Sequence, residues 1–362
     1  MPSGLSAYWE PRARLGSEDE SMVEIKNRQW LLAGRPQGLI EESDFRWNET
    51  TAPPLKDGQI LVRNLVLSFD PAQRGWMPMD TYMPAIPLGQ VMRAGGVGEI
   101  IESRRSGFAK GDLVRGLFGW EDYTVTDGGG PMGLKKLAPG ADPLLTLSLL
   151  GLTGLTAYFG TLAVGQAKAG DTFVVSGAAG ATGSVAGMIA KIKRCGVIGI
   201  AGGREKCDWL IKEAGFDAAI DYKGENVRDA LKRNCPKGID VYFDNVGGEI
   251  LDLVLARLAD GARVVLSGAI SRYNETSGVL GPGPKNYFNL IFRNARMEGF
   301  LVGQFARRFR EATADLSKWY AEGRVKNKID LQHGLENAPK TIIRLFTGAN
   351  FGKQLLKLAD PR

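Results

Sequence analysis

The sequence predicts a two-domain α/β protein in which a β-rich module precedes a doubly wound parallel sheet. Three observations lead to this fold class. The chain has 362 residues, enough for two separate cores. From Trp30 to about Ala138, short β-like runs alternate with frequent Gly and Pro. From Asp171 onward, strand-like and helix-like segments alternate, as they do in a parallel sheet covered by helices on both faces.

The composition is that of an ordinary globular protein with a mild excess of positive charge. Hydrophobic residues make up 44% and charged residues 24%, and 46 basic against 40 acidic residues give a net charge of +6. This excess mildly favours anionic ligands, and no nucleic-acid-binding motif accompanies it. Three cysteines without a C-x-x-C pair, and one histidine, His333, argue against a disulfide framework and a zinc site. We therefore expect no metal and a reducing, cytoplasmic compartment.

Two stretches have an unusual composition. Residues 1–21 are polar and charged, without the apolar core of a signal peptide, and we expect a flexible N-terminal extension. Pro143–Ala167 has no charged residue and is long enough to span a bilayer, but glycines and hydroxyl residues dilute its hydrophobicity. Because it leads directly into a glycine-rich unit, we expect a buried helix or helix pair at the domain junction.

The β-rich module contains runs with strand character at residues 59–70, 95–103, 111–120 and 121–127. Their alternation and close turns predict a partly open barrel. Gly95, Gly96 and Gly98 are not followed by a helix, so we interpret them as turn or bulge glycines. Near the C-terminus, the run GKQLLKLA (352–359) predicts a strand that returns to this module.

The second part of the chain predicts six parallel strands separated by helices. The expected strands are 172–176, 197–201, 218–222, 241–244, 263–267 and about 297–302. The expected helices include 206–214, 227–234, 250–258 and a later one near 307–320. Apolar strands alternating with helices are typical of a sheet that is buried on both faces.

A glycine-rich turn follows the first of these strands. The segment FVVSGAAGATG places Gly177, Gly180 and Gly183 three residues apart, directly before a stretch with helical spacing of apolar residues. A strand, a glycine turn and a helix in this order let backbone N–H groups and a helix N-terminus bind a pyrophosphate. The segment therefore predicts a dinucleotide site, because a plain glycine-rich loop would not need the strand and helix around it.

The end of the second strand distinguishes between the two nicotinamide cofactors. NAD sites usually place a carboxylate there, which binds the ribose 2′-hydroxyl. Here the strand runs into Gly202, Gly203, Arg204, Glu205 and Lys206, so two cations lie where a 2′-phosphate would bind. This favours NADPH over NADH. The alternative is that both cations are ordinary exposed residues of a first helical turn, where they oppose the helix dipole.

Several further motifs occur in a characteristic order: AAGATGS, AGGREK, FDNVGGE, SGAISRYN, GPGPKNY, RMEGF and GANFGKQLLK. Together they resemble the zinc-independent branch of the medium-chain dehydrogenase/reductase superfamily. The nearest resemblance is to the leukotriene B4 12-hydroxydehydrogenase/prostaglandin reductase group, which includes curcumin-reductase-like enzymes and alkenal double-bond reductases. It implies a GroES-like catalytic domain at 22–150, completed by 325–362, and a Rossmann NADP-binding domain at 151–324. It also implies a homodimer.

The resemblance implies specific cofactor and substrate residues. Tyr82 and Met83 would line the substrate cleft, and the alternative for both is simple core packing. Asp221 stands where the family motif leads us to expect Asn, which slightly weakens the assignment of Tyr222 as a contact of the cofactor's ribose phosphate. The cofactor would contact the glycine turn, the second- and third-strand ends, the segments after the later strands and the C-terminal segment: Gly180, Ala181, Thr182, Gly183, Gly202, Arg204, Lys206, Tyr222, Asn245, Ser267, Gly268, Ala269, Ile270, Tyr273, Phe300, Leu301, Val302 and Asn350.

The activity implied is NADPH-dependent reduction of a carbon–carbon double bond conjugated to a carbonyl. Hydride addition to the β-carbon creates an enolate, and Tyr273 is the candidate donor to its oxygen, because it follows the carboxyl end of the fifth strand. The α-carbon proton would come from Tyr273 or water. Tyr273 could instead only position the nicotinamide. A zinc-free alcohol dehydrogenase, a quinone reductase, and a nucleotide-binding protein without catalysis remain as alternative functions.

Overall fold

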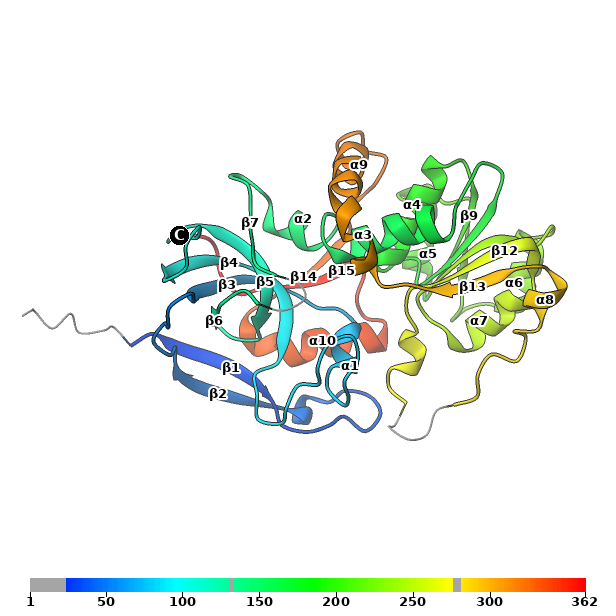
Figure 1. The fold of residues 1–362 in the computed structure, drawn as a ribbon. Helices are drawn as coiled ribbons and strands as arrows, with labels where there is room; N and C mark the ends of the chain where they lie inside the picture. The colour runs from blue at the N-terminus through cyan, green and yellow to red at the C-terminus, as the bar shows by residue number, and fades with distance from the viewer. Residues whose placement is uncertain (1–23, 130–132, 276–280) are drawn as a thin grey trace, which may run out of the picture.

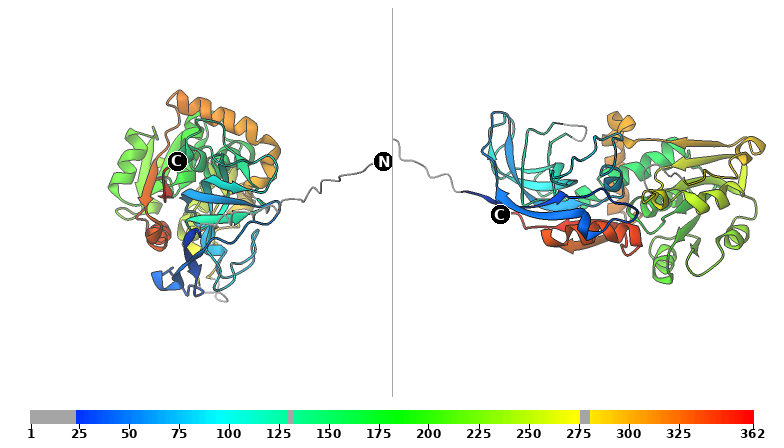
Figure 2. Two further views of the ribbon diagram at one scale, coloured as in Figure 1. Left: turned by 90° about the vertical axis from the view of Figure 1, so that its left-hand side faces the viewer. Right: turned by 90° about the horizontal axis from the view of Figure 1, so that it is seen from below.

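The computed structural model describes residues 24–129, 133–275 and 281–362, so the expected extension at 1–21 lies outside the described residues. Two lobes lie side by side, each built on its own sheet (Figures 1 and 2). The first lobe contains a two-stranded and a seven-stranded sheet, and the second contains a six-stranded sheet. The predicted fold class, a β-rich domain with a parallel-sheet domain, is confirmed. We propose the predicted domain boundaries for these lobes.

The first domain is a mainly antiparallel β-structure closed by the C-terminal part of the chain, whose strands β14 and β15 pair in parallel. Its seven-stranded sheet has the order β14-β15-β3-β4-β5-β7, with β6 paired to β3. A separate pair, β1 and β2, is antiparallel. The strands are β1 (Lys26–Leu32), β2 (Phe45–Thr51), β3 (Ile60–Ser68), β4 (Arg93–Ser103), β5 (Leu113–Gly119), β6 (Tyr123–Thr126), β7 (Lys135–Lys136), β14 (Ile329–His333) and β15 (Lys353–Lys357).

The predicted return of the C-terminal strand is confirmed. β15 pairs antiparallel with β3, and α10 (Ala338–Thr347) buries Ala338 and Ile342 in the core of the first domain. Gly98 lies in β4 beside a register shift in β3, and a Cβ there would lie 2.3 Å from the Val62 side chain. The glycines of β4 are therefore bulge and close-packing glycines, as the sequence predicted.

The second domain contains six parallel strands in the order β10-β9-β8-β11-β12-β13. Numbered by their appearance in this domain, this order is 3-2-1-4-5-6, the doubly wound order of dinucleotide-binding domains. The strands are β8 (Thr172–Ser176), β9 (Gly196–Ala201), β10 (Ala218–Asp221), β11 (Ile239–Asp244), β12 (Leu258–Leu266) and β13 (Arg296–Gly299).

Alternating side chains of these strands enter two cores, one on each face. Phe173 and Val175 of β8 belong to a core shared with α3, α4 and α9, whereas Val174 between them belongs to a core with α6 and α7. The helices are α3 (Leu152–Phe159), α4 (Ala181–Ile192), α5 (Arg204–Lys212), α6 (Val227–Asn234), α7 (Gly248–Leu255), α8 (Asn289–Phe292) and α9 (Phe309–Ala321).

The uncharged stretch 143–167 folds into α2 (Pro143–Leu147), α3 and a π-helical turn, Gly160–Val164, at the junction of the two lobes. This is the helix pair that the sequence predicted. Within the described ranges, no helix has the length and apolar character needed to cross a membrane. Short helical turns complete the chain: η1 (Glu42–Asp44), α1 (Ala72–Gly75), η3 (Ile270–Arg272), η4 (Val302–Arg308) and η5 (Leu335–Asn337).

Candidate functional site

The glycine turn after β8 lies where the strand order reverses, between β8 and β11. In open parallel sheets, ligands bind at this point beyond the carboxyl ends of the strands. Gly177 has φ +57°, which suits glycine, and Gly180 is the N-cap of α4. A Cβ on Gly183 would lie 2.4 Å from the Gly177 carbonyl oxygen, so only glycine lets α4 start this close to the turn.

The N-terminus of α4 is shaped to receive an anion. No side chain among the described residues caps it, and Ser184 donates to the Gly180 carbonyl instead. Ala181 and Thr182 form the first helical positions and are only partly buried. Their N–H groups, together with the helix dipole, would bind a pyrophosphate, as predicted for Gly180–Gly183.

Asp244, at the end of β11, organises the neighbouring loop and was not singled out from the sequence. Its buried carboxylate accepts hydrogen bonds from the Ser176 and Tyr242 hydroxyls, each at 2.8 Å, and from the Gly247 amide. Asn245 donates to the Ser176 carbonyl at 2.8 Å. These bonds hold Asn245, a predicted cofactor residue, directly beside the glycine turn. The motif FDNVGG could have indicated this role of Asp244, because a charged residue at the end of a buried strand needs hydrogen-bond partners.

The loop after β9 is closed by Asp221 from the end of β10. Its carboxylate accepts from the amides of Gly203 at 2.7 Å and Lys223 at 3.0 Å, and these backbone N–H groups lower the pKa of Asp221. Tyr222 packs so closely that a Cβ on Gly202 would lie 2.8 Å from its hydroxyl. Asp221, where the family motif would have Asn, therefore has a structural role, and the structure places the two predicted cofactor residues Gly202 and Tyr222 side by side.

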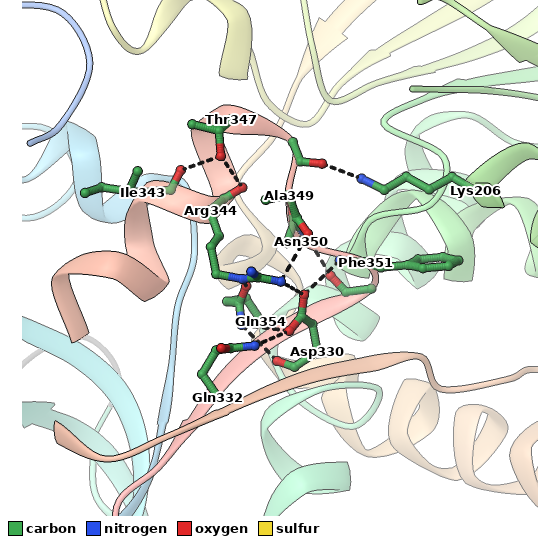
Figure 3. A network of polar contacts seen from close by, with 12 residues as sticks. Lys206, Asp330, Gln332, Ile343, Arg344, Thr347, Ala349, Asn350, Phe351 and Gln354 are labelled. Carbon is green, nitrogen blue, oxygen red and sulfur yellow. Dashed lines mark hydrogen bonds and ion pairs between the residues drawn. The ribbon is translucent and has the colours of Figure 1, made fainter. Parts of the chain in front are cut away.

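The two predicted cations differ in their surroundings. Arg204 is exposed at the first position of α5. Lys206 is partly buried, and burial, followed by the nearby charge of Lys223, lowers its pKa. Its Nζ donates to the Gly348 carbonyl at 2.8 Å, which links the second domain to the end of α10 (Figure 3).

The C-terminal segment after α10 reaches the glycine turn. The Gly352 amide donates to the Ala179 carbonyl at 2.9 Å, and Gly352 pairs with Gly180 in an isolated parallel bridge. Asn350 lies two residues earlier and donates to the Gly352 carbonyl at 3.3 Å. Asn350 therefore lies in the segment that contacts the second domain through Gly352, and its own contact with the cofactor stays a prediction.

The segment after β12 places Tyr273 near the same edge of the sheet. The amides of Ser267 and Gly268 both donate to the Asp244 carbonyl, and the Ile270 amide donates to the Asn245 carbonyl. The Tyr273 hydroxyl accepts from the Ala269 amide at 3.2 Å. Residues 267–270 and Tyr273 are therefore held against the loop that carries Asn245, as the resemblance implied.

Phe300, Leu301 and Val302 differ from the expected strand. β13 ends at Gly299, where its ladder with β12 ends, and Val302 starts a 3₁₀ helix. Phe300 packs against Phe305 with ring centroids 6.3 Å apart, and Leu301 is 56% exposed. Phe300 therefore has a packing role, whereas Leu301 presents an apolar side chain to solvent.

Tyr82 and Met83 have opposite environments. Tyr82 is 56% exposed, its ring lies 6.5 Å from that of Trp76, and desolvation together with nearby Asp70 and Tyr273 raises its pKa. Tyr82 of the first domain and Tyr273 of the second are therefore near enough for the charge of Tyr273 to act on Tyr82. Met83 is only 3% exposed and belongs to the core of the first domain, which favours the alternative of core packing for this residue.

A buried charge pair lies below the C-terminal segment. Lys353 is 2% exposed and pairs with Asp70, and its Nζ also donates to the Phe69 carbonyl at 3.1 Å. Arg74, in the neighbouring helix α1, is not part of this pair and donates to the carbonyls of Pro36 and Gly38. The sequence could not identify this pair, because its members are 283 positions apart.

No group of three or more His, Cys, Asp or Glu side chains that could hold a metal ion occurs in the part of the chain that the structure describes. His333 is exposed at the end of β14. The three cysteines, Cys195, Cys207 and Cys235, are buried free thiols.

Both parts of the chain match oxidoreductase family models. Residues 28–134 match a model described as the N-terminal domain of oxidoreductase, and residues 181–318 match one described as zinc-binding dehydrogenase. The NADPH-dependent curcumin reductase of Escherichia coli is 38% identical over 341 residues, covering 92% of this chain and 97% of that protein. The 2-alkenal reductase (NADP(+)-dependent) of Nicotiana tabacum is 38% identical over 345 residues, covering 93% and 98%.

A solved structure extends this likeness to three dimensions. CurA from Vibrio vulnificus in complex with NADPH has a TM-score of 0.87 and 38% identity, covering 92% of this chain and all of that chain. Together with the two-domain architecture, these relatives confirm the resemblance found in the sequence. The chain belongs to the zinc-independent medium-chain dehydrogenase/reductases, in the group that contains the curcumin, prostaglandin and alkenal reductases.

Proposed function

We propose that this protein is an NADPH-dependent reductase of carbon–carbon double bonds conjugated to a ketone or aldehyde. The predicted cofactor, NADP, is confirmed by relatives that are named for it and by the NADPH complex of a structural neighbour. The predicted class, an oxidoreductase, is confirmed by the same relatives. The identity of the enone or enal and the chemical roles of individual residues are our proposals.

The observation that carries the proposal is the convergence of three features at one edge of the parallel sheet. The uncapped N-terminus of α4 receives the pyrophosphate. Lys206, in the first turn of α5, and Tyr222, directly after β10, receive the 2′-phosphate. Tyr273 and Asn245 lie on the loops after β12 and β11, on the other side of the switch point. This order along the sheet is the order in which a dinucleotide lies across the switch point.

Bound NADPH supplies a hydride, which adds to the β-carbon of the substrate and leaves negative charge on its carbonyl oxygen. Tyr273 is suited to stabilise that charge, because its oxygen already accepts from the Ala269 amide and its own proton has no acceptor among the described residues. The phenol can therefore donate to the developing enolate oxygen. The α-carbon proton comes from Tyr273 or water, and a cofactor ribose hydroxyl can share in the stabilisation.

The substrate would lie between Tyr273 and the first domain. Tyr82 is the exposed aromatic side chain that approaches Tyr273 from that domain, and Leu301 is the exposed apolar side chain after β13. An apolar group with a planar conjugated system would pack against such side chains. Met83 contributes indirectly, by supporting the Tyr82 loop from the core.

NADPH oxidation measured with a small enone, a quinone and a simple ketone tests the proposal. We expect the enone to be turned over and to yield the saturated ketone. Faster turnover of the quinone, or reduction of the ketone to an alcohol, would favour the alternatives, a quinone reductase or a zinc-free alcohol dehydrogenase. Tight NADPH binding without any turnover would favour a protein that has lost catalysis.

We also propose that two copies associate through the second domain. β13 is an edge strand of the six-stranded sheet, and α8 beside it exposes 78% of Ile291 and 72% of Phe292. An unpaired strand edge next to exposed large apolar side chains is typical of a protein interface. Light scattering should show a dimer for the wild type and a monomer for Ile291→Asp. The three buried thiols support a cytoplasmic, reducing location.

A further inference from the structure

The segment from Arg344 to Gly352 touches the predicted cofactor site at two separate places. Although it belongs to the first domain by sequence position, Gly348 contacts Lys206 of α5, and Gly352 contacts the glycine turn at Ala179. We call residues 344–352 the bridging segment. One end of the segment thus lies at the proposed 2′-phosphate position and the other at the proposed pyrophosphate position; Figure 3 shows its contact with Lys206.

The Gly348 carbonyl determines where the Lys206 ammonium lies. Gly348 ends α10 in the left-handed conformation, with φ +70° and ψ 20°, so its carbonyl is directed away from the helix ladder. The Lys206 Nζ donates to this oxygen at 2.8 Å. A lysine ammonium has three protons, so Lys206 can keep this bond and still donate to a phosphate.

A second lysine converges on the same place. A Cβ built on Gly348 would lie 4.0 Å from both the Lys223 Nζ and the Tyr222 hydroxyl. The charge of Lys223 is also close enough to Lys206 to lower its pKa, after burial as the main cause. Lys223 has no ion pair among the described residues, so two ammonium groups and a phenol surround the small space left by Gly348.

The nearby carboxylates are already engaged. Asp221 accepts from the amides of Gly203 and Lys223. Asp330 pairs with Arg344 at 2.8 Å and accepts from the Phe351 amide at 3.1 Å. Neither is paired with Lys206 or Lys223. Two ammonium groups held close together, neither of them in an ion pair among the described residues, are stabilised by a dianion.

Arg344 and Asp330 hold the bridging segment in place. Arg344 donates to Asp330, to the Gln354 side chain and to the Ala349 carbonyl (Figure 3). Gln354 in turn donates to the Asp330 carbonyl at 2.9 Å. Both turns of the segment are therefore fixed to β14 and β15, which belong to the sheet of the first domain.

We propose that the cofactor's 2′-phosphate is bound across the domain interface. Lys223 is a second phosphate-binding cation, and the Gly348 carbonyl positions Lys206. A 2′-phosphorylated nucleotide therefore strengthens the existing contact of the bridging segment with the second domain by fixing Lys206, whereas a nucleotide without this phosphate does not. This inference rests on the proposed NADP site and goes beyond it by adding a specificity residue and a coupling between the domains.

Two nucleotide fragments test the proposal without turnover. Calorimetry should show that Lys223→Gln weakens 2′,5′-ADP by about tenfold, the effect of one cation near an anion at the protein surface, and leaves 5′-AMP unchanged. The matched control is Lys232→Gln, an exposed lysine on α6, which should change neither affinity. Since Lys223 is itself exposed, its substitution should leave the fold intact.

Hydrogen exchange tests the coupling. We expect 2′,5′-ADP, but not 5′-AMP, to slow exchange of the Ala349, Phe351 and Gly352 amides, which are hydrogen-bonded within or from the bridging segment. Equal losses in the two lysine variants, or equal protection by both fragments, would overturn the inference while the NADP site stands. If 2′,5′-ADP does not bind at all, both the site and the inference fail.

Discussion

Replacing Tyr273 by phenylalanine removes one hydroxyl from the proposed site and nothing else. Within the described residues that hydroxyl makes one hydrogen bond, in which the Ala269 amide donates at 3.2 Å. The bond is long, and Tyr273 is only partly buried. Its loss should therefore cost at most about 1 kcal/mol of the free energy of unfolding. The nicotinamide side of the site should keep its shape, because residues 267–270 are held by Asp244 and Asn245 through their backbone groups.

The loss of activity should be far larger than the loss of stability. Removing one donor to a developing oxyanion typically lowers kcat by about 10²–10³, which corresponds to about 2.7–4 kcal/mol. We expect this decrease in kcat for a small enone, measured by NADPH oxidation at saturating substrate, with little change in NADPH affinity. A role limited to positioning the nicotinamide would instead weaken NADPH binding as well.

The control is Tyr320→Phe, which removes a hydroxyl from an exposed tyrosine on α9 and should leave kcat unchanged. Thermal unfolding of both variants separates damage to the fold from damage to the chemistry. A Tyr273→Phe enzyme with kcat within about threefold of the wild type would refute the role of this hydroxyl as a donor, since a tenfold change already corresponds to only 1.4 kcal/mol.

Three further predictions concern the cofactor site and the cores. Gly183→Ala places a Cβ 2.4 Å from the Gly177 carbonyl oxygen, so α4 must shift. We expect weaker NADPH binding in fluorescence titrations and a loss of about 1–3 kcal/mol in the free energy of unfolding. Unchanged NADPH binding would contradict the close-packing argument. Burial acts to raise the pKa of Asp330, but hydrogen bonds, led by the one from Arg344, outweigh burial and lower this pKa in the folded protein. The ionised Asp330 side chain therefore stabilises the fold at pH values above the ordinary Asp pKa, and this stabilisation is lost as the pH falls through the lowered pKa of the folded state. Urea unfolding at pH 7 and at about pH 3 should thus show a smaller acid loss for Asp330→Asn than for the wild type; equal losses would exclude this linkage. Burial raises the pKa of the three cysteine thiols to about 11. Iodoacetamide at about pH 8 should therefore label the native protein slowly and the unfolded protein quickly. Fast labelling of the native protein would contradict this, because it would show that the thiols are accessible.

The parts of the fold that follow from local sequence were predicted well. β8 has the predicted bounds, because an apolar β-branched run is enclosed by Asp171 and Gly177. The glycine turn and the helix after it were predictable for the same reason, since a strand, close-spaced glycines and an amphipathic stretch are all local signals. The C-terminal strand was expected from its apolar run, and its partner β3 was expected only as a member of the same module.

The parts that depend on distant residues were not predictable. Lys353 reads as a surface residue, but it is buried because Asp70, 283 positions away, supplies its counter-charge. Met83 neighbours an exposed tyrosine in sequence, but the Tyr82 loop folds back and takes Met83 into the core. Lys206 was identified as a cation near the phosphate, whereas its bond to Gly348, 142 positions away, required the folded chain.

The central claim is that hydride is delivered to a conjugated carbon and not to the carbonyl carbon. Incubating the protein with NADPH deuterated at nicotinamide C4, on the face from which it transfers, and a small enone tests this most directly. We predict that NMR of the product will show deuterium at the β-carbon and an intact carbonyl group. Deuterium at the carbonyl carbon of an alcohol product, with the double bond retained, would contradict the account and identify an alcohol dehydrogenase.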